Sequence, residues 1–111
     1  MTNLNRSEDN DLLVALRHPL RRKILCEMDG KETISPRAVA TAIKEPLTGV
    51  SYHVRVLADR SAVVLVDTKP VRGSMQHFYR ATVRKPWARQ ALGLDPPEGG
   101  ATGESSTDPK A

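Results

Sequence analysis

Polar side chains that suit nucleic acids gather between positions 51 and 55. Ser51, Tyr52, His53 and Arg55 bring a hydroxyl, a phenol, an imidazole and a guanidinium close together in the sequence. Such groups form hydrogen bonds with base edges and with phosphate oxygens. Each has a plainer interpretation alone: Tyr52 packs on the preceding turn, Ser51 bonds to a backbone carbonyl, and Arg55 pairs with Asp59. As a group they favour a DNA-binding surface.

A helix over residues 48–60 is predicted to carry this group. Val50, Val54 and Leu57 recur at the spacing of one helix face, which we expect to point into the core. His53 then lies at the edge of that apolar stripe. The outward face of the predicted helix consists of Thr48, Gly49, Ser51, Tyr52, Arg55 and Asp59.

A shorter helix is predicted just before it. Ser35 is expected to be its N-cap, with Pro36 at the first helical position. Its small apolar face consists of Ala38, Val39, Ala42 and Ile43. Because the residue before a proline avoids the α region, Glu45-Pro46 ends this helix, and Thr48 is placed to cap the next one. Two short helices joined by a tight turn predict a helix-turn-helix, whose second helix enters a major groove with its first turns nearest the bases.

A β-hairpin is predicted to follow. Residues 63–69 and 75–81 are rich in β-branched and aromatic side chains, as strands are. The tip between them spans residues 70–74, where Gly73 is able to take the positive φ of a tight reversal. Arg72 in this tip is placed to reach the DNA backbone or the minor groove. Alternatively, Arg72 is an exposed loop arginine that has no partner, and the sequence favours neither interpretation.

Further helices are predicted on both sides. Upstream, two amphipathic helices start at Ser7, are separated at His18-Pro19 and end at Asp29-Gly30. Downstream, residues 84–92 predict a short helix that ends at Gly93. Trp87 and Ala91 share one side of that last helix, because they are four residues apart.

Charge is distributed unevenly along the chain. Residues 1–11 carry one Arg and three acids, and residues 91–111 carry one Lys and four acids. Residues 12–90 hold fifteen Lys and Arg against six acids, a net charge of +9. A basic domain between weakly acidic ends is typical of proteins that bind polyanions. We therefore expect a flexible N-terminal arm over 1–10, a folded domain over 11–93 and a disordered acidic tail over 94–111.

Several classes of protein are disfavoured by the sequence. No apolar run approaches the roughly 20 residues that span a membrane, and residues 1–10 are too polar and acidic for a targeting signal. The single cysteine, Cys26, precludes an intramolecular disulfide and fits a reducing cytoplasm. The sequence thus predicts a small cytoplasmic domain.

Three stretches of the sequence resemble the ArsR-type winged-helix regulators. Residues 50–57, VSYHVRVL, followed by Val63-Val64, are similar to the recognition helix and first wing strand of that family. They contain its pattern of serine, any residue, histidine and leucine, with Val54 at the leucine position. Residues 15–25 resemble its opening helices, and Tyr79-Arg80 resembles its second wing strand. The resemblance covers roughly residues 11–82.

The resemblance implies a mainly α fold with a small β-hairpin wing, the winged helix-turn-helix. It also implies a homodimer through the first helix and the short helix near Trp87, bound to double-stranded DNA. We expect base-edge contacts from Ser51, Tyr52 and His53. The start of the recognition helix, at Thr48 and Gly49, is expected to lie close to the DNA backbone. Phosphate contacts are expected from Arg37, Lys44 and Arg55, and Arg72 extends the footprint from the wing.

Metal sensing, catalysis and protein binding are the competing interpretations. A soft-metal site needs clustered thiolates or imidazoles, whereas the candidates Cys26, His18, His53 and His77 are scattered, so no metal or cofactor is predicted. Cys26 is expected to be a buried structural thiol. No pair of carboxylates, activated nucleophile or phosphate loop suggests an enzyme. A winged helix that contacts an acidic protein partner, without reading DNA sequence, stays open as the alternative.

Overall fold

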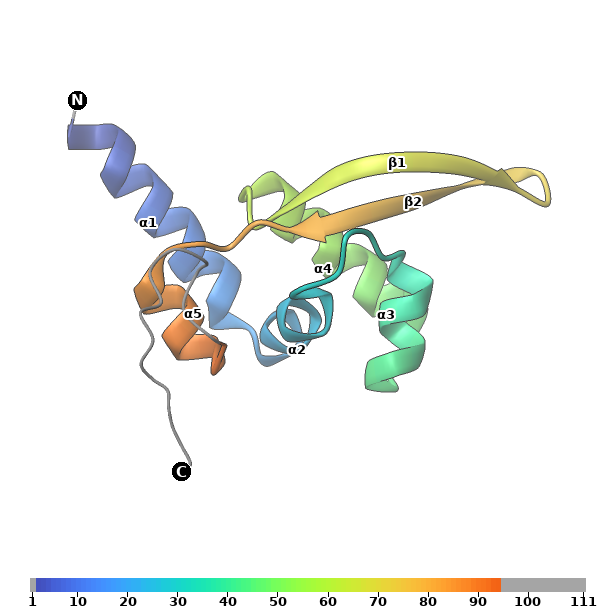
Figure 1. Ribbon diagram of the computed structural model, residues 1–111, viewed down its shortest axis with the longest axis horizontal. Helices are drawn as coiled ribbons and strands as arrows, with labels where there is room; N and C mark the ends of the chain where they lie inside the picture. Colours follow the sequence, from blue (N-terminus) through green and yellow to red (C-terminus); the bar gives the residue numbers. More distant parts are fainter. Residues whose placement is uncertain (1, 95–111) are drawn as a thin grey trace.

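Five helices and one antiparallel hairpin make up the described part of the protein. The computed structural model describes residues 2–94, with the side chains of residues 8–94. Along the chain the elements are α1 (Thr2–Arg17), α2 (Pro19–Met28), α3 (Pro36–Ile43), α4 (Leu47–Asp59), β1 (Val63–Val71), β2 (Ser74–Ala81) and α5 (Pro86–Leu92) (Figure 1). The expectation of a mainly helical fold with a β-hairpin is confirmed.

The core lies between α2, α3 and α4. The apolar stripe predicted on α4 is buried, because Val50, Val54 and Leu57 expose at most 1% of their surface. On α3 the buried residues are Val39 and Ala40, with Ile43 packed against them. Ala38 and Ala42, which were expected on the same face, are exposed. The helix is rotated toward its larger side chains, which bury more apolar area than alanine does.

The helix-turn-helix is formed by α3 and α4. As predicted, Pro36 opens α3, and the Ser35 hydroxyl accepts a hydrogen bond from the Ala38 backbone N–H over 3.1 Å. The turn after α3 depends on Lys44, which takes a left-handed conformation with φ 60°. The predicted cap of α4 is wrong: this helix begins at Leu47, so Thr48 already lies inside its first turn, and no side chain caps it.

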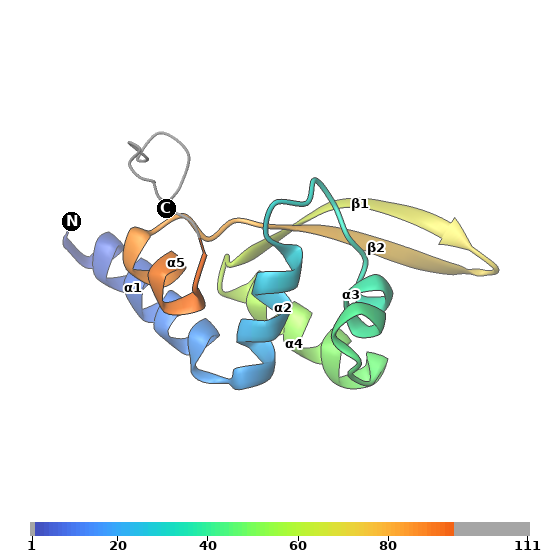
Figure 2. The ribbon, with the colours of Figure 1, turned by 60° about the horizontal axis from the view of Figure 1, so that its bottom comes forward.

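The hairpin is longer than its sequence suggested. Its strands continue to Val71 and from Ser74, so only Arg72 and Gly73 form the tip. Both residues have positive φ, 50° and 82°, as a two-residue hairpin turn with the right-handed twist requires. The register shifts between Leu65 and Asp67, which marks a β-bulge at the intervening residue. Figures 1 and 2 show the hairpin extending past α3, away from the helices.

Helices α1 and α5, which flank the helix-turn-helix and hairpin in the sequence, lie side by side in both views (Figures 1 and 2). Helix α1 begins at Thr2, so its predicted start at Ser7 is wrong, and helical backbone extends through residues 2–10. No Gly or Pro interrupts this stretch, so nothing local stops the helix from propagating. The predicted tail, residues 94–111, lies outside the described residues except for Leu94.

Arginine side chains join the helical segments. The C-terminal carbonyls of α1 accept hydrogen bonds from Arg21, at Val14, and from Arg22, at Leu16. These guanidinium groups satisfy carbonyls that a helix end leaves without partners. Arg89 on α5 makes a bidentate ion pair with Asp29 at the end of α2, over 3.0 and 3.2 Å. The charges thus fix α1 and α5 against α2.

A Schellman turn ends α4 and leads into β1. The Ser61 N–H donates to the Ala58 carbonyl, and the Ala62 N–H donates to the Leu57 carbonyl, which is the paired bonding that defines this motif. Ser61 occupies the left-handed position with φ 63°, where glycine is the usual residue. Its carbonyl accepts a hydrogen bond from the Thr82 hydroxyl over 2.9 Å.

Replacing Ser61 by glycine should stabilise the fold. Ser61→Gly removes the Cβ that disfavours the left-handed conformation, at some cost in unfolded-state entropy, so we expect a gain of about 0.5–1 kcal/mol in the free energy of unfolding. Urea denaturation at fixed protein concentration measures it. Ser61→Ala is the matched control, since it removes the hydroxyl but keeps the Cβ. A glycine variant no more stable than the alanine variant would contradict the expectation.

Candidate nucleic-acid interface

The outward face of α4 presents most of the predicted contact residues together. Tyr52 exposes 60% of its surface, Thr48 and Arg55 are exposed, and Gly49 and Ser51 are half-buried. Arg55 forms no ion pair among residues 8–94, so the predicted alternative of a pair with Asp59 is not found there. The first turns of α4 therefore offer a hydroxyl, a phenol and a free cation on one surface.

The predicted phosphate contacts lie on the neighbouring elements. Arg37 is exposed in the first turn of α3, and Lys44 is exposed in the turn that leads to α4. Arg72 is exposed at the tip of the hairpin. Within the described part of the chain, none of these cations is paired with a carboxylate. Arg37 and Lys44 add positive charge on the helix-turn-helix, and Arg72 carries positive charge to the tip of the hairpin (Figure 1), all of it available to a polyanion.

His53 has a different environment from its neighbours on α4. Its ring packs against that of His18, with centroids 4.4 Å apart, and meets Tyr52 edge-on at 5.1 Å. Its Nδ1 is buried and has no hydrogen-bond partner in the described structure. Burial, His18 and Arg21 together lower the pKa of His53 below its ordinary value of 6.5. The imidazole thus lies at the border between α4 and α2, uncharged at neutral pH.

The protein should become less stable as the pH is lowered, because of His53. Its pKa is lower in the folded state than in the unfolded chain, so the unfolded chain takes up the proton first as the pH drops below about 6.5. The free energy of unfolding should decline from there until the pH passes the folded pKa. Urea denaturation between about pH 7.5 and pH 5 measures the decline. His53→Gln should flatten it, whereas His77→Gln, on the exposed hairpin, should not.

Nothing in the sequence indicates that His18 lies beside α4. His18 is the N-cap of α2, and its Nδ1 accepts the Leu20 N–H over 3.1 Å. The break at His18-Pro19 predicts that a helix starts there, but it does not predict which other helix packs against His18. The fold brings this cap against His53, and Arg21 follows on the first turn of α2.

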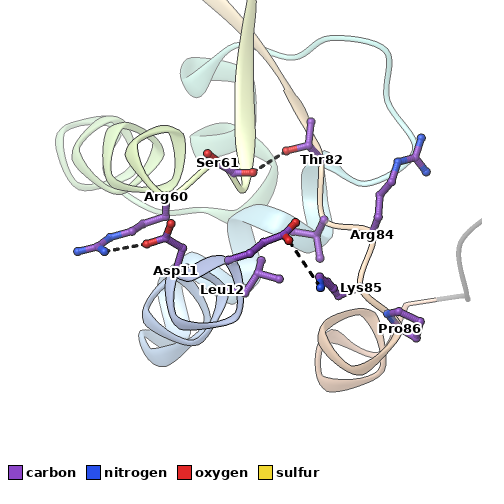
Figure 3. A pocket seen from close by; sticks show the side chains of 10 residues that line it. Asp11, Leu12, Arg60, Ser61, Thr82, Arg84, Lys85 and Pro86 are labelled. Carbon is purple, nitrogen blue, oxygen red and sulfur yellow. Dashed lines mark hydrogen bonds and ion pairs between the residues drawn. The ribbon is translucent and has the colours of Figure 1, made fainter. Parts of the chain in front are cut away.

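A hollow of about 640 Å³ lies on another part of the molecule (Figure 3). It is lined by α1, by the end of α4, and by the segment between β2 and α5. Arg60 and Asp11 form an ion pair of 3.0 Å in its wall. Lys85 lies 3.7 Å from carboxylate oxygens of both Glu8 and Asp9, which is beyond hydrogen-bonding distance. These contacts join the start of α5 to α1.

Of the side chains considered as metal ligands, His18 and His53 come together, which their spacing in the sequence did not suggest. No group of three or more such residues is found among the described residues. Cys26 is exposed, so the expectation of a buried thiol is wrong: its Sγ lies on the α5 side of α2, 3.3 Å from the Leu92 carbonyl oxygen. Partial burial and the carboxylate of Asp29 raise its pKa, so the thiol is protonated at neutral pH. Among residues 2–94, no helix is long and apolar enough to cross a membrane.

Two solved structures resemble this fold. NolR from Sinorhizobium fredii is 20% identical with a TM-score of 0.56, and the match covers 83% of this chain and 84% of NolR. A protein from Methanosarcina mazei Go1, described as a possible transcriptional regulator, is 13% identical with a TM-score of 0.55, over 77% of this chain and 72% of that one. No protein-family model and no curated protein sequence matches the chain.

These likenesses define the class of fold. A helix-turn-helix of α3 and α4, followed directly by the hairpin of β1 and β2, is a winged helix-turn-helix, as the sequence predicted. At identities of 20% and 13%, the two structures establish the architecture alone.

Proposed function

We propose that this protein is a sequence-specific DNA-binding transcriptional regulator of the ArsR type. The observation that carries the proposal is the outward face of α4, where Ser51, Tyr52 and Arg55 lie together, with exposed cations on α3 and in the turn that leads to α4. A helix presented in this way fits the major groove. The net charge of +9 over residues 12–90 supports a polyanionic partner, and the cytoplasmic setting predicted from the sequence fits this role.

In this proposal the contacts divide by chemistry. Ser51, Tyr52 and His53 contact base edges from the first two turns of α4, while Thr48 and Gly49 lie close to the DNA backbone. Arg37, Lys44 and Arg55 contact phosphates, which position the helix without reading sequence. Arg72 contacts the backbone or the minor groove from the tip of the wing, where the two-residue turn holds it.

Sequence selection tests the proposal first. Selection from random duplexes should recover a two-fold symmetric motif, and its affinity should fall roughly a thousandfold or more between about 50 and 200 mM salt if six to ten phosphates are contacted. Tyr52→Ala should weaken the selected site by about 1–3 kcal/mol more than random DNA. Arg55→Ala should weaken both alike. Arg84→Ala is the matched control, because it removes an exposed arginine on the link to α5. Equal effects of the Tyr52 and Arg55 variants on both DNAs would remove the assigned roles.

A homodimer through α1 and α5 is the second part of the proposal. Leu13 on α1 exposes 53% of its surface, Trp87 on α5 exposes 37%, and Ala91 is exposed as well. The adjacent face of α5 packs inward through Ala88 and Leu92. A second copy that covers the outer apolar residues would place two α4 helices for successive major grooves.

Charge placed on the dimer surface should separate the subunits. Leu13→Asp should raise the dimer dissociation constant at least tenfold, because it buries an unpaired carboxylate in the interface. Sedimentation equilibrium measures it. Met75→Asp is the matched control, since Met75 on β2 is equally exposed at 53%. If Met75→Asp weakens the dimer as much as Leu13→Asp does, or if neither substitution weakens it, this interface is wrong.

Protein binding without sequence recognition is the alternative function. Apolar side chains exposed on the hairpin favour it: Val64, Leu65, Val66, Val71 and Met75. Exposed apolar patches often mark protein contacts. If the selection recovers only salt-sensitive binding to all sequences, this alternative replaces the regulator.

A further inference from the structure

We propose that His18 and His53, with the charge of Arg21 close by, form a binding site for one phosphate of the DNA backbone, and that a proton is taken up when the phosphate binds. This inference rests on the proposed function, because the ligand is the DNA that α4 would read. It adds His18, which lies outside the helix-turn-helix, to the interface. It also reassigns His53 from the base edge predicted from the sequence to a backbone phosphate, because its ring packs against that of His18.

Two imidazoles pack together where α2 begins and α4 passes, and the charge of Arg21 acts on one of them. The His18 and His53 rings have centroids 4.4 Å apart and an interplanar angle of 44°. The Arg21 charge is close enough to contribute to lowering the pKa of His53. These groups come from three places in the sequence: the link between α1 and α2, the first turn of α2, and the second turn of α4.

The cluster contains polar atoms without partners. His53 Nδ1 and Arg21 Nε are both buried, and neither makes a hydrogen bond in the described structure. Arg21 donates from its Nη1 to the Val14 carbonyl, and among residues 8–94 no ion pair brings a carboxylate to any of the three groups. Buried polar groups of this kind are costly unless a water or an ion completes them. Because His53 Nδ1 is covered, an anion at this site would bond through the exposed imidazole of His18 and offset the positive charge beside His53.

The hydrogen bonding of His18 leaves a donor for such an anion. Its Nδ1 accepts the Leu20 N–H as the cap of α2. A neutral imidazole that accepts at Nδ1 carries its proton on Nε2. His18 is exposed, so this N–H is available to a phosphate oxygen while the cap stays intact. The N-terminus of α2 adds the positive end of its helix dipole.

The cluster lies on the side of the molecule that would approach DNA. Figure 2 shows the turn between α1 and α2 and the turn between α3 and α4 along the same lower edge. The first turns of α2 and α4 are neighbours. Leu20 of α2 packs over Gly49 of α4, so that a Cβ placed on Gly49 would lie 4.0 Å from Leu20 Cδ2. A DNA backbone that flanks the groove containing α4 would therefore pass the two imidazoles.

Phosphate binding and protonation are linked at this site. In the free protein, burial, His18 and Arg21 lower the pKa of His53, and the Tyr52 ring on α4 meets the same imidazole edge-on. A bound phosphate raises that pKa, since an opposite charge within a few ångströms favours the charged form. Between the free and bound pKa values, one proton is taken up per site, so affinity should rise by up to tenfold for each unit that the pH falls.

DNA binding as a function of pH tests the inference. Fluorescence anisotropy with the selected duplex, at constant ionic strength between about pH 5.5 and pH 8, should show tighter binding by the intact protein as the pH falls. His53→Gln should flatten this dependence. His18→Asn retains a capping side chain and should weaken selected and random DNA alike, by about three- to tenfold, with a smaller salt dependence. Circular dichroism checks that both variants are folded.

His77→Gln is the matched control. It removes an imidazole that stacks on Tyr79 in the hairpin, away from the cluster, and should leave the pH dependence of the intact protein unchanged. If His53→Gln keeps the full pH dependence, or His77→Gln abolishes it, the phosphate site is overturned even though DNA binding stands.

A second measurement separates this inference from the proposed function. Inorganic phosphate, added to the intact protein, should shift the imidazole NMR signals of His18 and His53 and raise the pKa of His53, while the signals of His77 stay in place. If no DNA is bound but these shifts occur, the regulator is refuted and the anion site remains. If DNA is bound but neither DNA nor phosphate moves the two signals, the anion site is refuted alone.

Discussion

The packing of α4 against α2 and α3 determines what the rest of the molecule can do. The seven largest fully buried side chains are Ile24, Leu25, Met28, Leu57, Val39, Val50 and Val54, and all lie on these three helices. Removing apolar surface from water is the main favourable contribution to folding, so this contact sets the orientation of α4. One stripe of the helix is buried, and the opposite face must point outward. The proposed DNA contacts are therefore a consequence of the core.

Sequence patterns predicted the elements where local rules were sufficient. The helical spacing of Val50, Val54 and Leu57 fixed the buried face of α4, and Ser35-Pro36 marked the start of α3. The patterns failed where tertiary packing decided the outcome. Thr48 suits a cap by composition, yet α4 begins one residue earlier, and Cys26 follows the helix pattern but faces outward. Propensity describes a residue with its neighbours in sequence, whereas these outcomes depend on other helices.

The candidate site shows the same division. Helical periodicity was sufficient to predict that Tyr52 and Arg55 lie on the outward face of α4, because that face is opposite the buried apolar stripe. The contact between His18 and His53 joins residues 35 positions apart and depends on how α2 crosses α4. A histidine before a proline predicts a helix boundary, which the structure confirms, but gives no partner for the ring. The roles of these residues toward DNA stay predictions for the experiments above.

The construction of the hairpin has a consequence for its dynamics. Among residues 2–94, only Ile34 pairs with the hairpin from outside, through two backbone hydrogen bonds to Tyr79 near its base. Beyond the bulge the strands are held by each other, and most of their side chains are exposed. Segments with so little buried contact open locally without unfolding the core. Amide hydrogen exchange should therefore be faster near Arg72 than in α4, and the wing can change its angle while the helix it accompanies stays fixed.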